Sequence, residues 1–441
     1  MNKFFCLLSI ILIWISSQPL YSQAKADSLL TSASLPNCIQ YALNHQPSLR
    51  QAKIDEQIID REIKSQLSDW YPQLNLTANY QDNFHLATTK FGDQLFNIGT
   101  YNTSSAQFAL TQTIFNRDVL IARSTAKDVR NQSKQITANK TIDLVANVSK
   151  AFYDVLLSKK QIELVNEDIL LLERSLKDAY NQYQGGIVDK TDFQRATISL
   201  NNAKAQRKTS EEQLKSKYAI LKLLISYPET QELDLLYDST QLAKEILMVD
   251  TLQGVNFNNR IEYQLLSTQK RLQEANVKYY KWGYLPSLSA FGQYNFNYLH
   301  NEFSKLYNQN YPQSYAGLTF SLPIFQGTKR NQQVKIAQLQ IDRLDFEFTA
   351  LKDSINTQYT QALALYKANL SNYYIQKDNL ELAKEVYNII QLQYRSGVKT
   401  YLEVITANTD LFSAQINYAN AAFQVLSNKI DVERALGTLQ F

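Results

Sequence analysis

The side chains that most often carry chemistry are few in this chain and are not grouped. Its three histidines, His45, His85 and His300, are far apart, and no two of them have the spacing of metal ligands. The sequence has neither a Gly-rich phosphate loop nor a Gly-x-Ser-x-Gly nucleophile elbow. Its carboxylates are scattered over helical faces, where solvation is the ordinary explanation. We therefore predict that the protein is not an enzyme and needs no cofactor or metal.

The composition excludes further classes of protein. Of 441 residues only 11 are Gly and 8 are Pro, which is about 2.5% and 1.8% against about 7% and 5% in ordinary proteins. A chain with so few turn-forming residues makes few, long elements, whereas an α/β enzyme of this length needs many turns. The 45 basic and 41 acidic residues leave a net charge of +4, so there is no electrostatic case for binding nucleic acid.

The first residues have the pattern of an export signal. One positive charge in Met1–Lys3 precedes the apolar run Phe4–Ile15, and small polar residues with Pro19 follow. A membrane anchor is the alternative, but an apolar run of about 12 residues is too short to span ~30 Å as a helix. We predict a signal peptide over 1–22, cleaved near Ser22–Ala24.

The rest of the chain contains two copies of one unit. The segment Tyr183–Ala196 aligns without gaps on Tyr394–Ala407, which lies 211 residues further on. Seven-residue steps back from the two tyrosines keep the copies in register. They pass through Val148, Val155, Ile162, Ile169 and Leu176 in the first copy, and through Tyr359, Tyr366, Tyr373, Leu380 and Tyr387 in the second. We assign the two repeats to 23–226 and 259–441, with a linker over 227–258.

This seven-residue period predicts coiled-coil packing of very long helices. We expect long helices over 116–182 and 327–394, each about 100 Å in length at 1.5 Å per residue. Return helices are expected over 190–226 and 401–437, with alanines along their seams that let two backbones approach closely. The tyrosines of the second ladder are interpreted as interhelix packing rather than as ligand-stacking sites.

Two pairs of segments alternate at period two instead. Over 73–86 the even positions are mainly apolar and the odd positions are all polar. Related alternation runs over 104–115, 287–299 and 313–325, although Phe291 breaks it. A half-buried strand of a soluble sheet also alternates. The export signal, the polar faces rich in Asn, Gln and Thr, and the aromatic residues near strand ends favour strands of an outer-membrane barrel.

Four strands cannot close such a barrel. In lipid an open sheet edge leaves backbone groups without partners, at several kcal/mol each, and the smallest common barrels have eight strands. We therefore expect at least two copies to share one barrel, with the long helices continuing its wall beyond the membrane.

Together, the export signal, the tandem halves, the strand pairs that lead into long helices and the two Tyr-x-x-Gly turns resemble the TolC-like outer-membrane efflux proteins. The resemblance covers nearly the whole mature chain, and the terminal Ala435–Leu439 is among its most specific parts. It implies a mainly α fold with membrane β structure. Tandem-repeat coiled-coil helices would form a periplasmic α-barrel, and four strands per protomer would join a shared twelve-stranded β-barrel in a homotrimer.

The same resemblance implies a passive exit duct in the outer membrane of a Gram-negative bacterium, in contact with its lipid and extending into the periplasm. Such ducts belong to tripartite efflux or type I secretion systems and pass small-molecule or peptide cargo. A periplasmic adaptor (membrane fusion protein) and an inner-membrane pump open the duct at its periplasmic tips.

Matched residue by residue, the resemblance assigns gate restraints at these tips. Thr191 and Asp192 of the first tip would restrain Tyr394 and Lys399 of the second. Lys399 stands where an arginine is usual, so its restraint should be weaker and less directional. An ordinary helix cap is the alternative for Asp192, and continuation of the packing ladder is the alternative for Tyr394.

A pore constriction is implied just after the second tip. Glu403 matches an acidic residue of the inner face, and Thr406 stands where relatives carry a second one. Three Glu403 carboxylates around a narrow axis would favour cations and would share protons through like-charge repulsion. A solvated carboxylate, favoured by the helix dipole, is the alternative.

The tips themselves are expected to contact the adaptor, because apolar groups at a loop apex suggest a partner. The residues assigned to this contact are Gly186, Ile187, Val188, Gly397 and Val398. For the two glycines, a simple left-handed turn is the alternative.

Two other classes of protein also contain long coiled coils. A soluble periplasmic adaptor would lack four alternating strands divided between tandem halves. A secreted structural coiled-coil protein would have no reason to repeat the strand pairs.

Overall fold

The computed structural model describes residues 30, 33–186, 188–236, 246 and 254–439. The signal peptide predicted over 1–22 and the tip residue Ile187 lie outside the described residues, as does much of the predicted linker. Within the part of the chain that the structure describes, none of the helices combines the length and the apolar character that a transmembrane helix needs.

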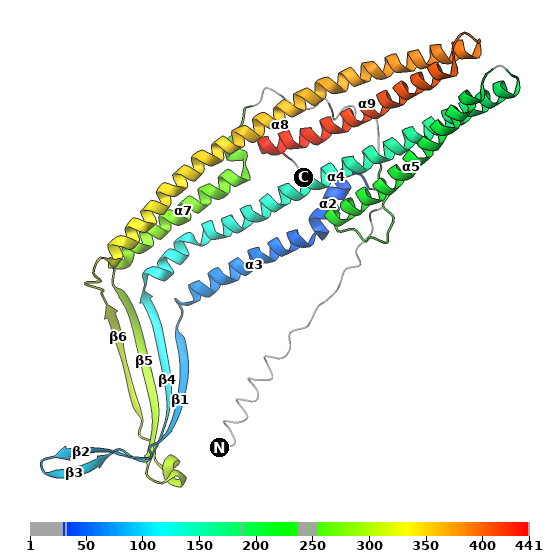
Figure 1. Ribbon diagram of the computed structural model, residues 1–441. Helices are drawn as coiled ribbons and strands as arrows, with labels where there is room; N and C mark the ends of the chain where they lie inside the picture. The colour runs from blue at the N-terminus through cyan, green and yellow to red at the C-terminus, as the bar shows by residue number, and fades with distance from the viewer. Residues whose placement is uncertain (1–29, 31–32, 187, 237–245, 247–253, 440–441) are drawn as a thin grey trace.

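The main elements, namely a helix, a strand pair, a long helix and a return helix, follow the same order in both repeats. The first repeat contains α2 (Leu35–His45), α3 (Pro47–Ser68), β1 (Gln73–Asp82), β2 (Ala87–Phe91), β3 (Gln94–Ile98), β4 (Asn102–Phe115), α4 (Arg117–Gln184) and α5 (Lys190–Ile225). The second contains η1 (Phe257–Asn259), α7 (Ile261–Lys281), η2 (Trp282–Tyr284), β5 (Ser287–His300), η3 (Phe303–Asn308), β6 (Gln313–Ser321), α8 (Lys329–Arg395) and α9 (Tyr401–Leu436). Figure 1 shows two long helical hairpins, α4–α5 and α8–α9, at one end of the molecule and the sheet at the other. The expected fold class, long coiled-coil helices with a sheet of four strands, is confirmed.

Local backbone chemistry sets the ends of the long helices. The Asn116 side chain caps α4 by accepting a hydrogen bond from the Asp118 amide, so the helix begins one residue later than predicted. Gly327, with φ +61°, delays α8 to Lys329. The return helices each end one residue earlier than predicted, because Ser226 (φ 57°) and Gly437 (φ 72°) take left-handed conformations.

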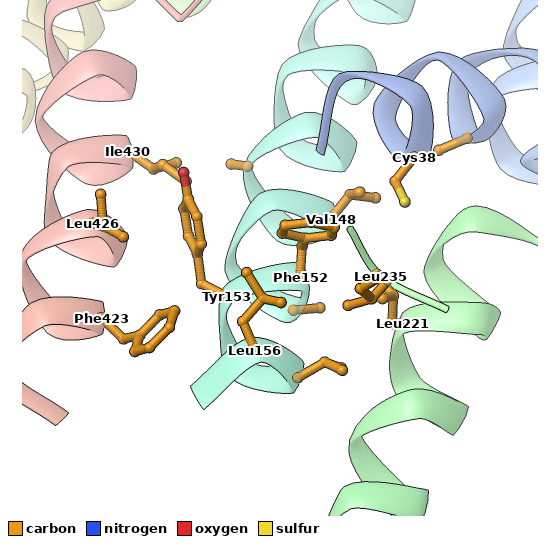
Figure 2. Packing of buried hydrophobic residues seen from close by; sticks show 14 of the residues in the cluster. Cys38, Val148, Phe152, Tyr153, Leu156, Leu221, Leu235, Phe423, Leu426 and Ile430 are labelled. Carbon is orange, nitrogen blue, oxygen red and sulfur yellow. The ribbon is translucent and has the colours of Figure 1, made fainter. Parts of the chain in front are cut away.

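The tyrosine ladder of α8 packs against α9. Tyr366, Tyr373, Leu380, Tyr387 and Tyr394 are buried at steps of seven residues. The helical part of the molecule, which we call the rod, extends from the sheet to the hairpin turns (Figure 1). The largest hydrophobic core lies nearer the middle of the rod, where α2, α4, α5 and α9 meet. Figure 2 shows side chains of α4, namely Phe152, Tyr153 and Leu156, packed between two groups of apolar residues. On one side lie Phe423, Leu426 and Ile430 of α9. On the other side lie Cys38 of α2, Leu221 of α5 and Leu235, which follows α5.

The sheet keeps the two chemical faces of its strands separate. Its order is β1-β4-β5-β6, and each neighbouring pair is antiparallel. Nearly every pair joins two even-numbered or two odd-numbered residues, so one face carries the even positions of all four strands. The even rung Leu76, Phe108, Tyr294, Ser314 is mainly apolar, and the odd rung Thr77, Gln107, Asn295, Gln313 is polar. The register changes only near Phe115, at a bulge beside the start of α4.

Four strand boundaries differ from the predictions, two of them by only one or two residues: β4 begins at Asn102 rather than at 104, and β5 ends at His300 rather than at 299. β6 ends at Ser321 rather than at 325, because Pro323 has no N–H to donate to a neighbour. β1 ends at Asp82 rather than at 86, where Asn83 turns back and donates its backbone N–H to the Tyr101 carbonyl at 2.7 Å.

An additional hairpin, β2–β3, follows this turn and was not predicted. It projects beyond the end of the main sheet (Figure 1) and turns at Gly92-Asp93. Gly92 has φ +64°. This dipeptide is a recognised hairpin signal and could have identified the pair.

Phe291, which breaks the polar pattern, covers a glycine on the next strand. A Cβ built on Gly317 would lie 2.8 Å from Cζ of the Phe291 ring. The ring therefore occupies the space that a side chain at position 317 would need, and the pattern break is a packing feature.

The end of α9 is fixed to the start of the second repeat. Arg260 is 4% exposed, donates to the Ala435 carbonyl at 3.0 Å and pairs with Glu262 at 2.9 Å. Gly437 then passes so close to Asn259 that an added Cβ would lie 2.7 Å from its carbonyl oxygen. These contacts fix the position of the chain just after α9.

We predict that Gly437→Ala lowers the melting temperature of the detergent-solubilised protein, measured by circular dichroism. The substitution adds a backbone clash to the cost of a left-handed non-glycine residue, roughly 1–2 kcal/mol. Gly327→Ala is the matched control, because Gly327 is left-handed too but has no atom within 4 Å of an added Cβ. Equal losses in the two variants would contradict the proposed role of the Asn259 contact.

Candidate functional site

Both hairpin tips lie at the end of the rod opposite the sheet (Figure 1). Gly186 (φ +70°) follows α4, and Gly397 (φ +75°) follows α8. An apolar cluster packs the helices together just behind the tips. Its buried members are Ala179 of α4, Ala196 of α5, Tyr394 of α8, and Tyr401 and Val404 of α9. The two hairpins of one protomer therefore meet at their tips.

Tyr394 connects the hairpins by a hydrogen bond as well as by packing. Its side chain is 8% exposed, and its hydroxyl donates to Oε1 of Gln182 on α4 at 2.8 Å. Burial raises the pKa of the Tyr394 hydroxyl, with a smaller contribution from nearby carboxylates that include Asp192. Asp192 is thus close enough to influence Tyr394, but the hydrogen bond goes to Gln182. No motif or period in the sequence marked Gln182.

The other predicted gate residues are distributed over the first turns of the return helices. Thr191 and Asp192 lie in the first turn of α5, where the Asp192 amide donates to the Asp189 carbonyl at 3.1 Å. Lys399 lies before α9, and its ammonium pairs with Glu403 at 2.6 Å. In the protomer as described, the ion pair of Lys399 is therefore made within its own tip. The predicted restraint between the two tips stays a prediction.

Glu403 is engaged on both carboxylate oxygens. Oε1 accepts from Lys399, and Oε2 accepts from the Thr400 amide at 2.9 Å and its hydroxyl at 3.0 Å, which completes a capping box. The Lys399 hydrogen bond, followed by those from Thr400, lowers the pKa of Glu403 to about 2. These contacts hold the carboxylate ionised and oppose proton sharing. Thr406 donates to the Leu402 carbonyl of its own helix at 2.9 Å.

The apex residues present open surface. Val398 is 71% exposed. A Cβ on Gly186 or Gly397 would have no atom within 4 Å, so their left-handed backbone, rather than crowding, accounts for glycine at these positions. Val188 is half-buried.

A series of polar contacts joins the first hairpin to the second from the middle of the rod to the tips. All five begin on α4 and end on α8 or α9. In order they are Asp143–Arg434, Lys150–Asp431 at 2.5 Å, Gln161–Asn420 at 3.0 Å, Asp168–Asn408 at 2.6 Å and Gln182–Tyr394 at 2.8 Å. The two contacts nearest the middle are ion pairs, and the others are hydrogen bonds. We call these five contacts the interhairpin series.

The sequence matches a known family model over most of its length. The model described as outer membrane efflux protein matches residues 38–226 and 263–438. The curated relatives include Outer membrane protein TolC of Escherichia coli, which is 26% identical over 435 residues, with 94% of this chain and 84% of the relative covered. Outer membrane protein OprJ of Pseudomonas aeruginosa is 23% identical, with 93% and 85% covered.

Solved structures share the fold. The outer membrane protein VceC of Vibrio cholerae superposes with a TM-score of 0.73 at 13% identity, with 91% of this chain and 96% of that chain covered. The CmeC outer membrane channel of Campylobacter jejuni gives a TM-score of 0.72 at 16% identity, with 92% and 85% covered.

Proposed function

Because the chain belongs to the outer membrane efflux protein family, we propose that it is the outer-membrane exit duct of a tripartite efflux or type I secretion system. The duct is passive, and cargo passes through it without a chemical step. The observation that carries the proposal is the sheet. Its strands place mainly apolar residues on one face and polar residues on the other, and β4 and β6 lead into helices about 100 Å long.

The exposed apolar face of the sheet supports placement in the outer membrane. Leu74, Leu318 and Phe320 are 66%, 68% and 64% exposed in the protomer. Such large exposed apolar side chains, alternating with polar ones on the same strands, suit a wall with lipid on one side and water on the other.

The open edges of the sheet support a homotrimer. Within the described residues β1 and β6 each pair on one side only. Joining β6 of one copy to β1 of the next satisfies both edges, and three copies make a closed barrel of twelve strands. The long helices of the three copies then surround the tunnel that leads through the periplasm.

We place the control of this duct at the tips, where a periplasmic adaptor and an inner-membrane pump engage it. Val398 and the left-handed glycine turns offer exposed surface for the adaptor. Tyr394 joins the hairpins within a protomer, and Asp192 adds a negative charge beside it. Small molecules or peptides are the cargo. The adaptor and secreted coiled-coil alternatives are not favoured, because neither accounts for a sheet shared between the repeats.

Extraction of the protein from the outer membrane is expected to require detergent. The purified protein is expected to form ion-conducting channels in planar bilayers. A chemical cross-linker should yield bands up to three copies. Recovery of the protein in the soluble periplasmic fraction, without detergent, would remove the basis for the duct.

Replacing Tyr394 and Asp192 together, as Tyr394→Phe with Asp192→Asn, should increase single-channel conductance. The double variant removes the hydroxyl that bonds Gln182 and the charge beside it, so the tips are held less tightly. Asp189→Asn is the control, since Asp189 is exposed in the same tip and makes no side-chain cap bond. Unchanged conductance in the double variant would refute a restraining role for these two residues.

Glu403→Gln should reduce the preference of the channel for cations, seen as a shift of the reversal potential in a salt gradient. Glutamine can still accept from the Thr400 amide, so the helix cap is kept while the charge is lost. Because the folded pKa lies well below the usual value, wild-type selectivity should persist on acidification until the pH approaches about 2. Glu385→Gln, at an exposed position on α8, is the control. If the reversal potential does not move, Glu403 lies away from the constriction.

A further inference from the structure

We propose that Asp168 is a buried charge that weakens the seam between the two hairpins of a protomer, so that its ionisation sets how readily the tips open. The proposal rests on the channel function proposed above. It adds a residue some distance from the tips to the machinery that controls them.

The carboxylate lies inside the seam with a single hydrogen-bond donor. Asp168 on α4 and Asn408 on α9 are each 8% exposed, and Nδ2 of the asparagine donates to Oδ1 of Asp168 at 2.6 Å. The neighbouring core is apolar. Its buried members are Val165, Ile169 and Leu172 of α4, and Leu200 and Ala203 of α5. A carboxylate removed from water in such surroundings is stabilised only partly by one neutral amide.

A cavity of about 310 Å³ adjoins the pair between α4, α5 and α9. Neutral polar side chains line it beside Asp168 and Asn408, namely Ser199, Asn202 and Gln206 of α5 and Thr409 of α9. Asp168 is the only titratable group in this lining, so the cavity offers hydrogen-bonding groups but no counter-charge.

The charged and titratable groups around the seam do not neutralise Asp168. From α8, Tyr387 faces it with a buried hydroxyl that has no hydrogen-bond partner among the described residues. Burial raises the pKa of that hydroxyl, Asp168 raises it further, and Arg174 and Arg395 act in the opposite direction. From α5, Lys204 pairs instead with Glu173 of α4 at 3.4 Å.

The sign of the effect follows from this environment. Burial raises the pKa of Asp168 above its usual 3.8, and the Asn408 hydrogen bond only offsets part of that rise. The packed seam therefore holds a proton more tightly than a separated, hydrated seam. Its stability is greatest below the ordinary carboxyl pKa and falls as the pH rises through the raised value. Once ionised, the carboxylate favours any arrangement that admits water to it.

The position of the Asp168–Asn408 pair in the interhairpin series determines which part of the hairpins is loosened when the seam weakens. On the side of the middle of the rod, Lys150–Asp431 is an ion pair at 2.5 Å. On the side of the tips, only the Gln182–Tyr394 hydrogen bond remains in the series. Weakening the seam at Asp168 therefore loosens the tip half of the hairpins while the ion-paired half stays joined.

Two substitutions at this pair should act in opposite directions on single-channel open probability in planar bilayers at about pH 7. Asp168→Asn removes the charge with little change of shape, so the open probability should fall several-fold. Asn408→Ala removes the one side chain of the described residues that donates to the ionised carboxylate, so the open probability should rise. A purely structural role would make both substitutions loosen the seam and move the open probability the same way.

A pH comparison supplies the second measurement. The open probability of the wild type should fall on acidification from neutral pH, and Asp168→Asn should lose most of this dependence. Glu167→Gln, the exposed neighbour on the same helix, is the control and should keep the wild-type profile. Equal profiles for the wild type and Asp168→Asn, or the same direction of change in both single variants, would overturn the proposal. A wild-type protein that does not conduct would instead refute the duct itself.

Discussion

Backbone hydrogen bonding at the edges of the sheet is the constraint on which the rest of the structure depends. Within the described residues β1 and β6 each have a neighbour on one side only, and their apolar faces are exposed. An edge of this kind is tolerated in lipid only when another strand covers it. In the proposed duct the protomer is therefore one sector of a larger wall. Its long helices extend that wall, because β4 leads into α4 and β6 leads into α8.

In the proposed duct the helical part must remain joined over a great length and yet be able to separate at one end. Near the middle, α4 is held to the neighbouring helices by a large apolar core and by ion pairs to Asp431 and Arg434. Toward the tips the apolar clusters are small, and the polar contacts are hydrogen bonds. The strength of attachment therefore declines from the middle to the tips, as expected for a part that moves.

The sequence predicted the architecture well and the site only in part. Period two located the four strands of the main sheet, and period seven located both hairpins. The β2–β3 hairpin was not predicted, because each of its strands has only five residues, although Gly92-Asp93 marks its turn. At the tips, Glu403 takes part in a local capping box and the Tyr394 hydroxyl bonds to Gln182. Residue types alone could identify neither Gln182 as the hydrogen-bond partner of Tyr394 nor the Asp168–Asn408 pair.

Some features of the protein depend on residues that are close together in the chain, and others depend on residues that are far apart. Alternation, helical repeats, caps and left-handed turns depend on residues close together in the chain, so the sequence by itself determined the elements, their lengths and the two-faced strands. The interhairpin series joins residues 212 to 291 positions apart. Which asparagine meets Asp168, and whether water reaches that carboxylate, follows from how two helices rotate and pack against each other. Only the tertiary structure decided this, because burial and partners do not exist until the helices are assembled.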